Sequence, residues 1–163
     1  MDLPERIETA RLRLILVTPE DAADMVAGRR QDRWHPDYPR RTDVDAATLV
    51  SAGDTWGPRH VVLGHRAVGS IGCFGPPGPP GDEGEPPETE VGYGLVEEVR
   101  GAGLATEALG ALVAEADRLG VRLRAGVDPT NVASLKVLAR CGFTELRGSN
   151  EDGELVMVRP LRS

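Results

Sequence analysis

Several kinds of residue are scarce in this 163-residue chain, and each scarcity excludes a class of function. Aromatic residues make up only 4% of the chain, which leaves few rings on which nucleic acid bases could stack. The net charge is −7, so the chain also lacks the basic field that nucleic acid binding requires. No apolar run approaches the ~20 residues that cross a bilayer. We therefore expect neither a nucleic acid nor a membrane partner.

Reactive side chains are scarce as well. Cys73 and Cys141 are the only cysteines, they lie far apart in the sequence, and they form no CxxC pair. We therefore predict no disulfide. His35, His60 and His65 are also dispersed, so we predict no metal site. The N-terminus is acidic and polar, unlike a signal peptide. These features favour the reducing cytoplasm as the compartment of this protein.

The residues that are abundant indicate a folded protein. The chain is 40% apolar and 28% charged, which is a globular composition, and its length suits one domain over residues 1–163. The segment 75–88, GPPGPPGDEGEPPE, is too rich in proline and glycine for regular structure. Because neither flank is long enough to fold alone, we interpret this segment as a long loop, either a lid or a disordered stretch.

The chain is organised around the segment from Glu90 to Leu112. Its first part alternates apolar side chains at Val91, Tyr93 and Leu95, which predicts a strand. Its second part repeats apolar residues every four positions from Leu104, which predicts a helix. A short acidic and glycine-containing turn joins the two. The segment is therefore predicted to be a strand–loop–helix unit.

The loop of this unit, Arg100-Gly101-Ala102-Gly103, predicts an anion site. Glycines at the start of a helix leave its first N–H groups uncovered, and the helix dipole adds a positive field there. Because glycine has no Cβ, a phosphate can approach this backbone closely. No Gly-Lys-Ser/Thr follows, so the loop is not a P-loop, and Ala105 breaks the dinucleotide-binding spacing. A simple tight turn is the alternative.

The remaining elements follow from periodicity and from turn residues. In the first half we predict a strand at 10–17, a helix at 19–28 capped by Thr18, a short helix capped by Thr42 or Asp43 and ending near Val50, and strands at 59–63 and 67–74. In the second half we predict a strand at 121–127, a helix at 132–140 capped by Asn131, and a hairpin of 143–147 with 155–158. The order β-α-α-β-β-β-α-β-α-β-β indicates an α+β fold of mixed α/β layers.

A few polar or reactive residues outside these patterns have plain interpretations. Cys141 is predicted to be a small buried residue at a helix end and not a nucleophile. Glu107, Asp117 and Arg118 are predicted to form a solvated face of the helix that begins near Leu104.

Two motifs, separated by one helix and one strand, carry a family resemblance. Arg100, Gly103 and Ala105 fit the pattern Arg/Gln-x-x-Gly-x-Gly/Ala, and this stretch resembles motif A of the GNAT superfamily of acyl-CoA N-acyltransferases. Residues 128–143, DPTNVASLKVLARCGF, resemble the second signature of that family, Asn-x-x-Ser/Ala before a helix that ends in Gly-Phe. The N-terminal ETARLRLILVTPEDA resembles the branch that includes ribosomal-protein alanine N-acetyltransferases. The resemblance is weakest across 29–58 and in the loop rich in proline and glycine.

The resemblance implies a central, largely antiparallel twisted sheet flanked by helices, with acetyl-CoA as co-substrate and no metal. It also implies direct acetyl transfer to a primary amine, on a protein N-terminus or a small amine-bearing molecule, by a monomer or homodimer. A non-catalytic acyl-CoA-binding protein and a mononucleotide-binding domain are the alternatives. The residues that the resemblance assigns to the cofactor are Leu95, Val96, Glu97, Arg100, Gly101, Ala102, Gly103, Leu104, Ala105, Thr106, Asn131 and Ser134.

Direct transfer requires a base, because a protonated amine must lose its proton before it attacks. Glu90, on the strand face opposite to Tyr93, is the candidate base, and Glu88 is the second choice. The alternative for Glu90 is a carboxylate on an edge strand that faces water. The reaction also requires a backbone N–H for the developing oxyanion and a donor for the departing thiolate.

Ser134 is the candidate donor, since the resemblance places it near the sulfur and places Asn131 near the pantetheine arm. The two residues are three positions apart, so they share one face of the helix near its start. The alternative is that Asn131 only caps the helix and Ser134 is its partner in the cap. Many family members carry Tyr where this chain has Leu138. Either Ser134 or Tyr93 therefore takes the role of that Tyr, or the thiolate leaves unassisted.

Overall fold

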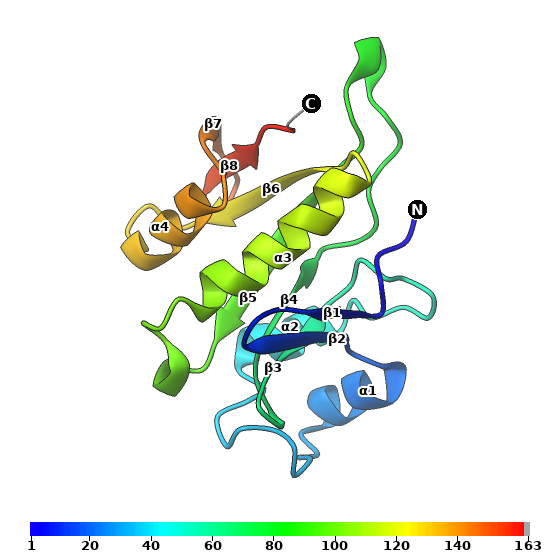
Figure 1. Cartoon of the computed structure of the whole chain (residues 1–163), viewed down its shortest axis with the longest axis vertical. Coiled ribbons are helices and arrows are strands. Elements are labelled where there is room, and N and C mark those ends of the chain that lie inside the picture. Colours follow the sequence, from blue (N-terminus) through cyan, green and yellow to red (C-terminus); the bar gives the residue numbers. More distant parts are fainter. Residues whose placement is uncertain (162–163) are drawn as a thin grey trace.

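Eight strands form one twisted sheet in residues 1–161, the part of the chain that the computed structural model describes (Figure 1). Their order across the sheet is β1-β2-β3-β4-β5-β6-β8-β7. The strands are β1 (Arg6–Glu8), β2 (Leu12–Leu16), β3 (Arg59–Leu63), β4 (Arg66–Cys73), β5 (Glu88–Leu95), β6 (Arg122–Val127), β7 (Glu145–Ser149) and β8 (Leu155–Arg159). The helices are α1 (Pro19–Ala27), α2 (Arg41–Ala47), α3 (Leu104–Arg118) and α4 (Val132–Arg140), and two 3₁₀ turns are η1 (Asp82–Gly84) and η2 (Glu97–Val99). The predicted α+β class is confirmed.

One pair of strands breaks the antiparallel pattern of the sheet. β5 and β6 run parallel and are paired only where Glu88–Glu90 face Arg122–Arg124. All other neighbours are antiparallel, and β4 follows β5 along Val91–Leu95. The second half of β5 is therefore paired on its β4 side alone, and the sheet opens between β5 and β6 after Glu90. Figure 1 shows α3 lying across this part of the sheet.

The helices cover both faces of the sheet. On one face, α1 and α2 are tied to the central strands by buried polar contacts: His60 of β3 lies 2.9 Å from Asp21, and Ser70 of β4 lies 2.5 Å from Asp43. His60 and Ser70 are directly opposed in the β3–β4 ladder, so these contacts lie on the same face. α3 packs on the other face, against β1, β2, β5 and β6. Its buried row is Leu104, Ala108, Leu109, Leu112, Val113 and Ala116.

The start of α1 and the end of α4 follow from a few neighbouring residues, as the sequence predicts. The Thr18 hydroxyl accepts a hydrogen bond from the Asp21 N–H at 3.0 Å, and this caps α1. At the end of α4, Gly142 has φ +90° and the Phe143 N–H donates to the Leu138 carbonyl at 2.9 Å. This is a Schellman ending, which buries the Phe143 ring against the core.

In the N-terminal half, the structure adds one strand that was not predicted and corrects the bounds of one predicted helix. β1 was not predicted, because three residues with one buried side chain, Ile7, are too short to show a period of two. The helix predicted to be capped by Thr42 or Asp43 and to reach Val50 instead spans Arg41–Ala47, with Arg40 at the N-cap position. Asp43 lies inside its first turn and accepts a hydrogen bond from the Arg40 N–H at 2.8 Å. Asp43 is therefore not the N-cap residue. It is the third residue of the helix, and its side chain binds the N–H of the N-cap residue, Arg40.

The loop rich in proline and glycine is not a lid over the start of α3. It projects from the end of the molecule opposite to the start of α3 (Figure 1). It contains one short 3₁₀ turn, η1, where the sequence predicted no regular structure. Its two ends are held together by a hydrogen bond from the Thr89 hydroxyl to the Gly75 carbonyl at 2.9 Å. No helix in the described residues is long and apolar enough to cross a membrane.

Candidate functional site

A cavity of about 470 Å³ opens where the start of α3, the second half of β5 and the first turns of α4 meet. The unit predicted from the sequence therefore forms two of its walls. The lining residues are Arg40, Tyr93, Gly94, Leu95, Arg100, Gly101, Gly103, Leu104, Ala105, Thr106, Asn131, Ala133, Ser134, Lys136, Val137 and Arg140.

The start of α3 provides uncovered N–H groups. Gly103 is the residue before the first helical turn, has φ +78° and supplies no side chain to cap the helix. Gly101 also has a positive φ, +85°, which favours glycine over any residue with a Cβ. The first N–H groups of α3 thus face the cavity with the positive end of the helix dipole. This is the geometry of an anion site.

Hydrogen bonds from the turn between β1 and β2 hold this loop in place. Arg11 donates one hydrogen bond to the Ala102 carbonyl and another to Glu107 of α3, at 2.8 and 2.7 Å. The Thr9 hydroxyl also donates to Glu107. These bonds, the one from Thr9 first, lower the pKa of Glu107. The prediction that Glu107 belongs to a solvated helix face is therefore wrong, and Asp117, which pairs with Arg159, departs from it as well.

The free edge of β5 provides a second set of backbone groups. The Glu90 carbonyl and the Val96 N–H bond to the β4 side, through Phe74 and Val68. Because backbone groups alternate along a strand, those of Tyr93 and Leu95 point the other way, into the opening beside β6. The Leu95 carbonyl already accepts a hydrogen bond from Arg100 Nε at 3.0 Å. The Tyr93 and Leu95 N–H groups are thus aimed at the cavity.

Two hydroxyl groups meet across the cavity. The Tyr93 hydroxyl and Ser134 Oγ are 2.8 Å apart and form a hydrogen bond in which either hydroxyl can donate. Asn131 caps α4 as predicted, because its side-chain oxygen accepts a hydrogen bond from the Ser134 N–H at 3.1 Å. Burial, the largest cause, raises the pKa of Tyr93, so the Tyr93 hydroxyl stays protonated at neutral pH. Leu138, which stands where the family resemblance led us to look for a Tyr, is buried in the core.

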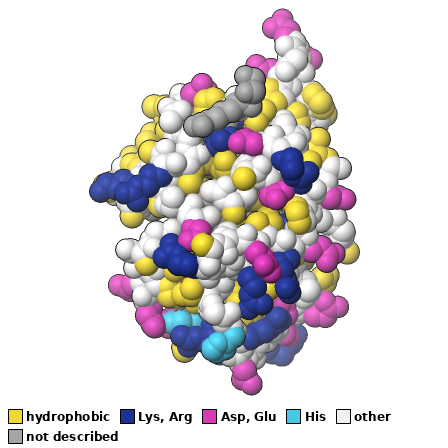
Figure 2. All heavy atoms as spheres, in the orientation of Figure 1, with side chains coloured by type: hydrophobic (Ala, Val, Ile, Leu, Met, Phe, Trp, Pro, Cys, Tyr) yellow, Lys and Arg dark blue, Asp and Glu magenta, His cyan; other side chains and the backbone are white. Residues whose placement is uncertain are grey.

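The charge of the cavity is opposite to the charge of the chain. Arg40, Arg100, Lys136 and Arg140 line it, and no carboxylate is among its described lining residues. Figure 2 shows basic side chains gathered over α4, where Lys136 and Arg140 are the basic residues. A local basic surface on a chain of net charge −7 favours a small anion over a polyanion.

Glu90, the candidate base, lies beside the cavity and not in its lining. It is the last β5 residue paired with β6, directly where the sheet opens. Its Oε1 is 3.4 Å from Arg124 Nε, and 31% of its side chain is exposed. Glu90 can therefore reach the opening through water, on the face opposite to Tyr93.

Glu88 is engaged by three arginines. It accepts hydrogen bonds from Arg147 at 2.7 and 2.8 Å, from Arg122 at 2.6 Å and from Arg124 at 2.8 Å. These bonds, the one from Arg147 first, lower the pKa of Glu88 from 4.5 to about 2. A carboxylate this weakly basic is a poor proton acceptor, which argues against Glu88 as the base.

The Glu88 cluster predicts a pH-dependent stability. Because the pKa of Glu88 is about 2 in the folded protein against an ordinary 4.5, its stabilising effect is full above pH ~4.5 and is lost as the pH falls toward ~2. We expect Glu88→Gln to lower the free energy of unfolding by about 1–3 kcal/mol at neutral pH. Urea denaturation should show this difference shrinking below pH ~4.5. Glu85→Gln, at an exposed carboxylate that shares Arg122, is the control and should change stability by under ~1 kcal/mol. A pH-independent difference for Glu88→Gln would contradict the account.

Most predicted cofactor residues converge on the cavity, and three do not. Val96 is buried and its N–H is bonded to β4, Glu97 is exposed at the start of η2, and the Ala102 carbonyl faces Arg11. Those that line it are Leu95, Arg100, Gly101, Gly103, Leu104, Ala105, Thr106, Asn131 and Ser134. The sequence did not point to Arg40, Gly94, Lys136 and Arg140. Arg40 and Gly94 lie outside both motifs, and Lys136 and Arg140 lie within residues 128–143 but at none of its signature positions.

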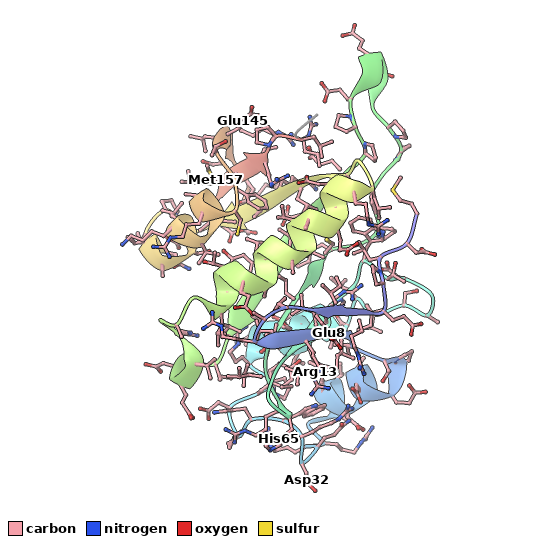
Figure 3. The ribbon with its side chains drawn as sticks, in the orientation of Figure 1. Glu8, Arg13, Asp32, His65, Glu145 and Met157 are labelled. Carbon is pink, nitrogen blue, oxygen red and sulfur yellow. The ribbon has the colours of Figure 1, made fainter. Side chains whose placement is uncertain are left out.

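The histidines lie apart from this site. His65 lies in the β3–β4 turn at the end of the molecule opposite to the loop rich in proline and glycine (Figure 3). His60 bonds Asp21, and His35 bonds Glu98 at 2.8 Å. Residues 1–161 contain no group of three or more His, Cys, Asp or Glu side chains that could hold a metal ion.

Comparison with known proteins identifies the family. A family model described as the acetyltransferase (GNAT) domain matches residues 11–144. The chain belongs to the GNAT family. A search of curated proteins returned no match. As a GNAT protein, it is an acetyl-CoA-dependent acetyltransferase, and the uncovered start of α3 with its basic surroundings fits the phosphates of that co-substrate.

Solved GNAT structures share its fold. The Mycobacterium smegmatis RimJ in complex with CoA-disulfide has a TM-score of 0.64 and 21% identity, and the match covers 97% of this chain and 89% of that one. The ribosomal-protein-S5-alanine acetyltransferase of Vibrio fischeri has a TM-score of 0.66 and 17% identity, with 98% of each chain covered. The microcin C7 self-immunity acetyltransferase MccE, in complex with acetyl-CoA and AMP, has a TM-score of 0.65 and 16% identity, with 96% and 97% covered. At these identities the likeness concerns the fold.

Proposed function

We propose that this GNAT protein transfers the acetyl group of acetyl-CoA directly to a primary amine, in a ternary complex and in the cytoplasm. The observation that carries the proposal is one cavity that combines an uncovered helix N-terminus, a free strand edge and a hydroxyl pair. Acetyl-CoA supplies an acetyl group activated as a thioester. The residues of the chain bind and orient it and move the protons.

The two backbone surfaces bind different parts of acetyl-CoA. The N–H groups at the start of α3, with Arg100, Lys136 and Arg140 nearby, hold the pyrophosphate. The free edge of β5 holds the pantetheine arm as an added strand would be held, through main-chain hydrogen bonds. A β5 N–H, from Tyr93 or Leu95, stabilises the charge that develops on the carbonyl oxygen.

Glu90 is the proposed base. It stands where β5 and β6 separate, on the face of the sheet that α1 and α2 cover, so an amine entering from that face meets it through water. No carboxylate lines the described cavity, so a base must act from its margin. The side chains of the Glu90–Arg124 ion pair are 31% and 34% exposed, and the contact of Glu90 Oε1 with Arg124 leaves the other carboxylate oxygen for this role.

The Tyr93–Ser134 pair is the proposed proton donor to the departing thiolate, and this predicts coupled mutants. Tyr93→Phe and Ser134→Ala should each lower kcat by about 10- to 100-fold and leave acetyl-CoA affinity within a factor of ~3. Because the two hydroxyls act as one unit, the double variant should cost about as much as either single one. Steady-state kinetics of the three variants test this. If the kcat losses of the two single variants multiplied in the double variant, the two hydroxyls would have independent roles. An unchanged kcat in all three variants would mean that the thiolate departs unassisted.

The acceptor is a protein N-terminus or a small amine-bearing molecule. The similar solved structures differ in their named activities: one is a ribosomal-protein-S5-alanine acetyltransferase and another a microcin C7 self-immunity acetyltransferase. The N-terminal ETARLRLILVTPEDA, with its resemblance to the ribosomal-protein branch, favours the first.

Thiol release from acetyl-CoA tests the proposal across a panel of amines, N-terminal peptides and aminoglycosides. We expect amine-dependent release with at least one acceptor class, and protection of the fold by CoA of roughly 2.7 kcal/mol at a hundredfold excess over Kd. Binding of CoA without release on any amine would favour the alternative, a non-catalytic acyl-CoA-binding protein.

A further inference from the structure

Among the described residues that line the cavity, Arg40 is the one that comes from the α1–α2 segment. Its guanidinium group packs closely against Gly94 of β5: a Cβ placed on Gly94 would overlap Nη2 and would lie 2.6 Å from Nη1. Gly94 sits between Tyr93 and Leu95, whose N–H groups point into the opening. The guanidinium group is therefore beside the reacting end of the proposed site, on the face from which the amine would enter.

Asp43 fixes the orientation of this guanidinium group. Its two carboxylate oxygens accept from Arg40 Nε and Nη2, both at 2.9 Å, in a fork-like pair. Asp43 is buried and also accepts from the Arg40 N–H and from the Ser70 hydroxyl, so its acceptor capacity is filled. Among residues 1–161, Arg40 Nη1 has no hydrogen-bond partner. The pair is neutral overall, yet it presents oriented N–H donors to the cavity.

The segment before Arg40 is anchored from two directions. The buried Tyr38 hydroxyl bonds His60 Nδ1 at 2.7 Å, and His60 Nε2 bonds Asp21 at 2.9 Å. His35 bonds Glu98 of η2 at 2.8 Å, which ties the same segment to the turn before the loop Arg100–Gly103. Arg40 is thus held by a rigid frame, and a donor held in advance loses little entropy on binding.

We propose that Arg40 is a specificity residue that donates a hydrogen bond to an oxygen next to the reacting amine. This deepens the proposed function, on which it rests, and commits it to a substrate class. The acceptors favoured are α-amino acyl compounds, in which a carbonyl or carboxylate oxygen stands one carbon away from the amine. Guanidinium is a donor only, so an amine that lacks such an oxygen gains nothing from it. The oxygen can come from the first peptide group of a protein N-terminus or from a free amino acid.

Three matched probes test the proposal by affinity, independently of turnover. L-alaninamide carries a carbonyl, L-alanine carries a carboxylate, and isopropylamine has neither. Calorimetry measures the binding of each to the enzyme saturated with CoA, for the wild type and for Arg40→Gln. Comparing the two proteins on the same amine cancels the different basicities of the amines. Arg41→Gln, at the exposed neighbouring arginine, is the control. Arg40→Lys keeps a cation beside Asp43 and replaces Arg40→Gln if that variant melts early.

We expect Arg40→Gln to weaken binding of alaninamide or alanine by about 10- to 100-fold and isopropylamine by less than ~2-fold. Arg40→Lys, which lacks the planar fork, should show the same selectivity at about 3- to 10-fold. CoA affinity and Arg41→Gln should stay near wild type. Of L-alaninamide and L-alanine, the probe whose binding Arg40→Gln weakens more shows whether the oxygen comes from a carbonyl or from a carboxylate. An equal change for all three probes, or no binding of the oxygen-bearing probes to the wild type, overturns the proposal. Selective binding without thiol release on any amine would retain the Arg40 site and refute the transferase.

Discussion

Gly103→Val is expected to lower the affinity for CoA at least ~100-fold while the protein remains folded. Gly103 holds φ +78° directly before the first turn of α3. A branched side chain there strains the backbone by about 1–3 kcal/mol and places its methyl groups over the N–H groups that are proposed to bind the pyrophosphate. Calorimetric titration with CoA measures the affinity, and circular dichroism with thermal melting confirms the fold.

Gly120→Val is the matched control for this experiment. Gly120 follows the other end of α3, has φ +71°, and a Cβ there meets nothing within 4 Å. It should show a similar loss of stability with unchanged CoA affinity, because it is far from the cavity. If Gly103→Val held CoA as the wild type does, the loop would be only a turn.

Glu90→Gln is expected to lower turnover at neutral pH by about 10² to 10⁴, the usual contribution of a general base. The substitution keeps the size of the side chain and removes the proton acceptor, so acetyl-CoA affinity should change little. The loss should shrink at high pH, because more of the amine is then already deprotonated. The pH profile of kcat for wild type and variant, with the best acceptor found, measures both effects.

The same profile separates a chemical role of Glu90 from a binding role. A carboxylate that only held the ammonium group of the acceptor would affect chiefly KM and would matter most where the amine is charged. Glu8→Gln, at an exposed strand carboxylate on β1, is the control and should leave kcat unchanged. A kcat of Glu90→Gln within a factor of three of wild type at neutral pH would remove Glu90 from the mechanism.

Local chemistry made much of the fold predictable. The Thr18 cap, the Asn131 cap and the Gly142 ending each depend on a few consecutive residues, so α1 and α4 have nearly the predicted bounds. The loop Arg100–Gly103 and the helix that it starts were predictable for the same reason, since the glycines and the first helical turn are adjacent in sequence. The order of the elements after β1 followed from periodicity and turn residues along the chain.

Contacts between distant segments could not be read from the sequence. Arg11 and Glu107 are separated by 96 positions, and neither lies in a motif. Arg40 reaches the cavity only because Asp43, Ser70 and Gly94 come together from three elements. The separation of β5 from β6 after Glu90 is likewise a property of the paired strands, and no local pattern in either strand encodes it.

A crystal structure of the protein with CoA tests the location of the active site most directly. The account predicts the pyrophosphate on the backbone N–H groups around Gly103, the pantetheine arm along Tyr93–Leu95 in the opening between β5 and β6, and the sulfur beside the Tyr93–Ser134 hydroxyl pair. CoA bound elsewhere, for example in the smaller cavity between η1 and Glu145, or with its phosphates away from the start of α3, would contradict it.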